Sequence, residues 1–94
     1  MDPKQFQAIL AAHILRLVAF AQRDGRRLDL DQLAGALDVR RVDVRATLSA
    51  LHREGLMDVT RMRLTLRGFA TGIGLAAEQL RPLRCLPPFR AAAA

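Results

Sequence analysis

The chain has 94 residues, a formal net charge of +6 and a single cysteine, Cys85. This length suits one domain with a real core, and burial against a partner would add to the stability of so small a domain. One cysteine excludes an internal disulfide, and the apolar run over residues 8–21 is too short and too polar to span a bilayer. With no export leader at its start, the chain is expected to be cytoplasmic, with no membrane partner.

The first predicted helix begins at the N-terminus. Asp2 can cap it, Pro3 suits the first helical position, and Gln5 can act as the reciprocal capping residue. The apolar pattern continues to Arg23, and Gly25 is expected to stop the helix. Its apolar positions cover more than the roughly 100° arc that docks one face on a core, so further apolar surface must be covered elsewhere.

A second, shorter helix is predicted from its cap and its apolar spacing. Asp29 can accept a hydrogen bond from a free N–H group at the helix start, and Gln32 can reach back to it. Asp38 follows where a left-handed residue is expected, because Asp tolerates that conformation better than most residues. One apolar stripe lies between these signals: Leu30, Leu33, Ala34 and Leu37.

A third helix is predicted between Asp38 and Gly55. Val44, Leu48 and Leu51 form its apolar stripe, and Gly55 is a C-terminal cap. The residues around this stripe are expected to face away from the core: Arg40, Arg41, Asp43, Arg45, Ala46, Ser49 and Arg53.

The pattern then alternates and becomes helical again. Leu56–Val59 and Met62–Leu64 are predicted as two short strands joined at Thr60 and Arg61. A closing helix is predicted to run to Pro82, with one apolar stripe: Leu66, Phe69, Ile73, Ala76 and Leu80. We therefore predict one domain over residues 1–81 and a Pro/Ala-rich tail over residues 82–94.

The segment LDLDQLAGALDVRRVDVRATLSALHREGLMDV, followed by RLTLRGFATG, resembles the winged helix-turn-helix of small bacterial transcription regulators of the MarR and PadR kind. The resemblance covers about residues 28–72. It implies a mainly α fold with a small β-hairpin, in the order helix, helix, helix, wing, helix. Arg41–Arg53 would be the recognition helix, Leu56–Leu64 the wing, and Thr65 the cap of the closing helix. The sequence departs from the pattern at Asp38, where Gly is common, and at Arg40, where a Ser or Thr cap is common.

Positive charge gathers on this same segment. Residues 40–67 hold seven Arg against three acidic residues, a balance of +4. A genome bias explains the choice of Arg over Lys but not this clustering, and a basic surface is what binding to DNA phosphates requires. We therefore expect double-stranded DNA as the partner of a transcription regulator, with these contact residues: Arg40, Arg41, Arg45, Ala46, Ser49, Arg53, Arg61 and Arg63.

Both ends of the domain predict a homodimer. The first helix has apolar surface to spare, and the closing helix repeats small residues at Gly68, Gly72 and Ala76, a ridge that a neighbouring backbone would approach closely. The alternative is that the two helices pack only on each other within one subunit. The residues expected at a dimer interface are Phe6, Leu10, Ile14, Leu17, Gly68, Gly72, Ile73 and Ala76.

No catalytic or metal-binding pattern is visible, so neither an enzyme nor a cofactor is expected. His13 is expected at a core or interface position, and His52 at a phosphate contact or a solvated position. Cys85 is expected to be an inert thiol rather than a redox sensor. A winged-helix module that binds another protein or shapes DNA is the alternative to a regulator. Apolar anchors on the third helix would favour that alternative. Nothing in the sequence identifies a small-molecule effector.

Overall fold

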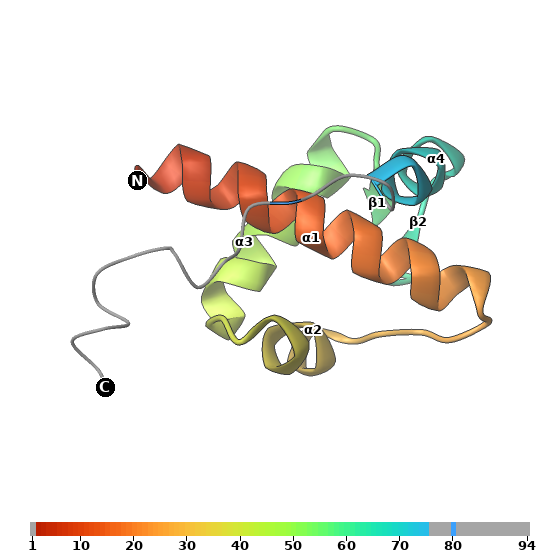
Figure 1. Ribbon diagram of the computed structural model, residues 1–94, viewed down its shortest axis with the longest axis horizontal. Coiled ribbons are helices and arrows are strands. Elements are labelled where there is room, and N and C mark those ends of the chain that lie inside the picture. The colour runs from red at the N-terminus through yellow and green to blue at the C-terminus, as the bar shows by residue number, and fades with distance from the viewer. Residues whose placement is uncertain (1, 76–79, 81–94) are drawn as a thin grey trace.

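The computed structural model describes residues 2–75 and 80, and this part of the chain is mainly helical with one small antiparallel hairpin (Figure 1). The elements follow in the order α1, α2, α3, β1, β2 and α4. The long α1 crosses the molecule, with α2 on one side of it, α4 on the other, and α3 and the hairpin behind (Figure 1). None of the described helices is long and apolar enough to cross a membrane.

Helix α1 spans Pro3–Arg23, with the predicted start and end. Asp2 is extended at the N-cap, and its carboxylate accepts a hydrogen bond from the Gln5 N–H group at 2.8 Å. After the helix Gly25 adopts a φ of 77°, a left-handed conformation that glycine reaches at low cost. The inner face supplies much of the core and has six buried residues: Leu10, Ile14, Leu15, Val18, Ala19 and Ala21.

Helix α2 spans Leu30–Leu37, and its capping box is present as predicted. Asp29 accepts from the Gln32 N–H group, and the Gln32 side chain accepts from the Asp29 N–H group, each at 2.8 Å. Asp38 is left-handed, with φ 55° and ψ 51°. The tight turn leads into α3, which spans Arg41–Arg53.

The hairpin is shorter than predicted. Strand β1 is Met57–Asp58 and strand β2 is Arg63–Leu64, with Met57 opposite Leu64. The chain leaves the ladder early because the carboxylate of Asp58 accepts from the N–H and hydroxyl groups of Thr60, and because Met62 has a φ of 51°. Met57 and Leu64 are buried.

Helix α4 spans Leu66–Gly74. Thr65 caps it as predicted, accepting from the Gly68 N–H group, and also donates its hydroxyl to the Gly55 carbonyl. The expectation that Leu66 joins the apolar stripe is wrong: this first residue of the helix is 86% exposed. Ala76, the predicted helix end at Pro82 and the tail lie outside the described residues.

The predicted dimer interface needs correction. Leu10 and Ile14 have no exposed surface, because the core of their own chain encloses them. The ridge of Gly68 and Gly72 also faces its own subunit. A Cβ at Gly68 would collide with the Leu56 carbonyl, and one at Gly72 with the Leu15 carbonyl. Close packing within one chain therefore explains these four residues.

Phe6, Leu17 and Ile73 differ from the other predicted interface residues, because they are only half-buried. Each packs against the edge of the core and leaves part of its side chain at the surface. These three residues are the described part of the predicted interface that remains available to a partner.

Candidate functional site

Helix α3 has one buried and one exposed face. Val44, Thr47, Leu48 and Leu51 are buried, and the Thr47 hydroxyl donates to the Asp43 carbonyl at 2.8 Å. The opposite face is exposed and carries four of the predicted contact residues together with the apolar Val42. The structure therefore places four of the predicted contact residues of α3 on one outer surface: Arg45, Ala46, Ser49 and Arg53.

At the start of α3, two of the predicted arginines are held by carboxylates. Arg40 donates to both oxygens of Asp43, from Nε at 2.9 Å and from the terminal guanidinium nitrogen at 3.1 Å. This hydrogen bond, helped by the negative charge of Asp43, raises the pKa of Arg40. Arg41 pairs with Asp31 of α2, with Nε 2.6 Å from a carboxylate oxygen. These carboxylates compensate part of the positive charge that Arg40 and Arg41 present to a ligand.

Arg45 and Arg53 differ from Arg40 and Arg41, because no carboxylate of the described residues holds them. Neither has an ion pair or side-chain hydrogen bond within the part of the chain that the structure describes. Ser49 lies between them at four-residue intervals, so the three form one row that rises about 12 Å along the helix. This row presents two uncompensated positive charges and a hydroxyl to solvent.

The hairpin adds further cations. The Arg61 Nε lies 3.7 Å from Asp58, a loose surface pair, whereas Arg63 has no ion pair among the described residues. The hydrogen bond from the Thr60 hydroxyl, together with backbone hydrogen bonds and Arg61, lowers the pKa of Asp58. Asp58 therefore stays charged and holds the turn that carries Arg61.

Several contacts were not anticipated from the sequence. Asp31, in the first turn of α2, pairs with Arg41 of α3. His52 holds the hairpin to α3, because its Nδ1 donates to the Met57 carbonyl at 3.1 Å. Arg27 lines a pocket together with Arg63. The basic segment RDGRR at residues 23–27 was the signal for Arg27, but no local pattern tells which element it faces.

The described residues contain no group of three or more His, Cys, Asp or Glu side chains placed to hold a metal ion. The surface of α3 and the hairpin offers exposed guanidinium and hydroxyl donors. Such groups bind carboxylates, phosphates and the edges of bases. Comparison with family models, curated proteins and solved structures gave no match to the chain.

Proposed function

We propose that this protein is a DNA-binding transcription regulator with a winged helix-turn-helix fold. In this proposal α3 is the recognition helix and enters the major groove, and the hairpin is the wing that contacts the minor groove or its phosphates. The observation that carries the proposal is the row of Arg45, Ser49 and Arg53 on the exposed face of α3, with small Ala46 beside it. A guanidinium without a carboxylate partner is ready to bind a base or a phosphate.

The two free arginines have different roles in this proposal. Arg45 lies nearer the N-terminal end of α3, where recognition helices contact base edges, and it binds guanine through the O6 and N7 acceptors. Arg53 lies at the other end and binds phosphate, which positions the protein without identifying bases. Arg40 and Arg41 contribute less, because Asp43 and Asp31 compensate their charges.

Fluorescence anisotropy with the DNA upstream of the protein's own gene tests the proposal, with unrelated DNA as the comparison and a salt series for each. Arg45→Ala should lose about 1–3 kcal/mol of discrimination at particular G·C pairs. Arg53→Ala should weaken binding to all sequences alike and lower the salt slope by about 0.9. Equal losses of specific and nonspecific binding in both variants would instead indicate an architectural DNA-binding protein.

Val42 and Leu66 support a second candidate, a module that binds another protein. Val42 is 60% exposed on the proposed DNA-binding face of α3, and Leu66 is 86% exposed. Exposed apolar side chains can act as anchors in a protein interface. If this candidate is correct, the wild-type protein binds neither the upstream DNA nor the unrelated DNA more strongly than a neutral control protein does. The proposal of a regulator is then wrong.

A further inference from the structure

A pocket of about 220 Å³ lies between the end of α1, the connection to α2, and the start of β2. Gln22 belongs to α1, Arg27 and Leu28 to the connection, and Met62 and Arg63 to the hairpin. Residues some forty positions apart in the chain thus form its walls. The fold, rather than any local motif, creates this pocket.

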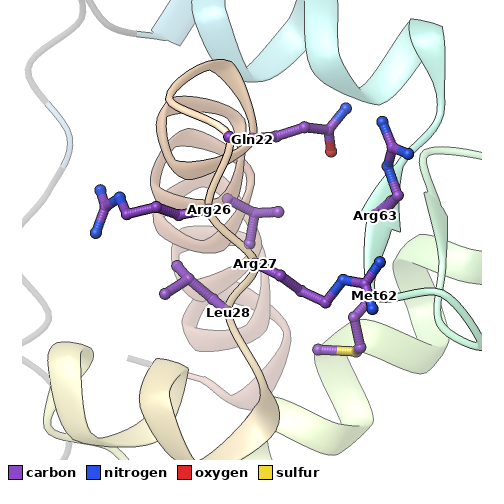
Figure 2. A pocket seen from close by; sticks show the side chains of 8 residues that line it. Gln22, Arg26, Arg27, Leu28, Met62 and Arg63 are labelled. Carbon is purple, nitrogen blue, oxygen red and sulfur yellow. The ribbon is translucent and has the colours of Figure 1, made fainter.

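The side chains of Arg27 and Arg63 bracket the pocket (Figure 2). Arg27 extends from the connection toward Met62, whereas Gln22 points toward Arg63 at the other end. The neighbouring Arg26 also belongs to the pocket wall, but its side chain points away from the hairpin, on the opposite side of the connection (Figure 2). Two guanidinium groups from separate elements are therefore available to one ligand.

The charges in the pocket are not balanced by the protein. No Asp or Glu is among the described residues that line it, and neither the Arg27 nor the Arg63 side chain has an ion pair or hydrogen bond in residues 2–75 and 80. Arg26, by contrast, lies 3.9 Å from Asp24. Like charges around one cavity repel each other, and a bound anion would remove that repulsion.

Gln22 adds a fixed hydrogen-bond donor. Its Oε1 accepts from the Leu64 N–H group at 2.9 Å. Because a backbone N–H group can only donate, this bond assigns the oxygen, and the amide NH₂ group remains to donate to a ligand. Around the pocket, guanidinium and amide N–H groups therefore provide donors suited to the oxygens of an anion.

We propose that this pocket binds one phosphate group. Its volume is below the roughly 300–1,000 Å³ of sites for drug-sized ligands, so it suits a single tetrahedral group. Guanidinium groups bind phosphate oxygens through paired N–H donors, which favours phosphate over a halide. The phosphate comes either from the DNA backbone, a source that rests on the proposed function, or from a free phosphate or phosphomonoester, which does not.

Titration with inorganic phosphate at constant ionic strength tests the pocket without DNA. The Nε–H resonances of Arg27 and Arg63 should shift and saturate in NMR spectra, while equivalent sodium chloride gives no saturation. Arg27→Gln and Arg63→Gln should each weaken phosphate binding about tenfold or more, as expected for loss of a hydrogen bond between charged groups.

Arg26→Gln is the matched control, because it removes the same charge from the adjacent residue, whose side chain points away. It should change phosphate affinity less than about twofold, roughly the limit of a screened surface charge. All three arginines are exposed, so thermal unfolding should be unchanged in every variant. The proposal that the pocket binds phosphate would be refuted if the wild type showed no saturable shifts. It would also be refuted if Arg26→Gln and Arg27→Gln lost phosphate affinity equally.

DNA binding then identifies the source of the phosphate. If the pocket holds a backbone phosphate, Arg27→Gln lowers the salt slope of DNA binding by about 0.9 and Arg26→Gln does not. If the slope is unchanged while Arg27→Gln loses inorganic phosphate, the source is a free phosphate compound. If the wild-type protein binds phosphate but no DNA, the proposed phosphate site stands and the proposed function is refuted.

Discussion

Carboxylates divide the arginines at the proposed DNA-binding surface into two groups. Arg40 and Arg41 are held by Asp43 and Asp31, whereas Arg45 and Arg53 are not paired within the described chain. Exposed ion pairs add little to the free energy of folding. Their larger effect is on the positive potential that a phosphate would meet.

We expect Asp31→Asn to strengthen DNA binding. The change releases Arg41 and removes a negative charge beside α3, so affinity at low salt should rise about three- to tenfold by electrostatic complementarity. Stability should change by less than about 0.5 kcal/mol, because both side chains are exposed. Fluorescence anisotropy measures the first effect and urea unfolding the second.

Asp24→Asn is the control for this variant, because Asp24 pairs with Arg23 and Arg26 and not with α3. It removes the same charge and should leave DNA affinity nearly unchanged. An equal gain from both variants would show that net charge alone, rather than release of Arg41, governs binding.

Asp58 gives the hairpin turn a dependence on pH. Its pKa in the folded protein is below its ordinary value of about 3.9, chiefly because of the hydrogen bond from the Thr60 hydroxyl. Its stabilising contribution is therefore fully present above the unfolded-state pKa and is lost as the pH falls through the lower folded-state pKa. Protonation should loosen the turn that carries Arg61.

Thr60→Val should raise the pKa of Asp58 toward its ordinary value, because it removes the hydroxyl donor. NMR titration of the Asp58 carboxyl group measures this shift. Thr71→Val is the control, since the Thr71 hydroxyl donates to the Arg67 carbonyl in α4, away from the turn. An unchanged pKa in Thr60→Val would mean that the hydroxyl is not what holds the carboxylate.

At the scale of elements, glycines determine how closely α4 approaches its neighbours. Gly72 lies against the Leu15 carbonyl and the Ala19 side chain of α1, and Gly68 lies against the backbone of Leu56. Gly74 is in the same helix but has open space where a Cβ would stand. The same residue type is thus required by packing at two positions and not at the third.

Gly72→Ala should lower the free energy of unfolding by about 1–3 kcal/mol, because the added methyl overpacks the contact with α1. Gly74→Ala should leave it unchanged or raise it by up to about 1 kcal/mol, since alanine favours the helix and meets no neighbour. Urea unfolding compares the two variants. Equal stability would contradict the close contact between α1 and α4.

At the scale of the whole molecule, the proposed homodimer depends on less surface than the sequence indicated. Leu10, Ile14 and the two ridge glycines are enclosed by their own chain, and Phe6 and Leu17 keep part of their surface. A symmetric dimer would place two copies of α3 in successive major grooves about 34 Å apart. The binding site should then be a pseudo-palindrome.

Light scattering at tens of micromolar should give about twice the 10.4 kDa mass of one chain. Phe6→Ala should weaken association about tenfold or more, as truncation of a buried aromatic anchor does. Phe20→Ala is the matched control, because Phe20 is half-buried on the same helix and contacts Arg23. A monomeric wild-type protein would refute the dimer before either variant is needed.

The sequence by itself determined the helix boundaries that depend on neighbouring residues. The caps at Asp2, Asp29 and Thr65 join groups three residues apart, and the left-handed residues Asp38 and Gly55 end helices through backbone conformation. These interactions form within one or two turns and need no other element. The burial of the inner face of α3 followed in the same way, because helical periodicity separates its two faces.

Only the tertiary structure decided which surfaces meet. It turned the glycine ridge of α4 toward its own subunit, paired Arg41 with Asp31 of another helix, and brought Arg27 to the same pocket as Arg63. These contacts join residues that the sequence places on separate elements. The physical reason is that periodicity shows which face of an element is apolar or charged, whereas the packing of the core sets the angle and distance at which that face meets another.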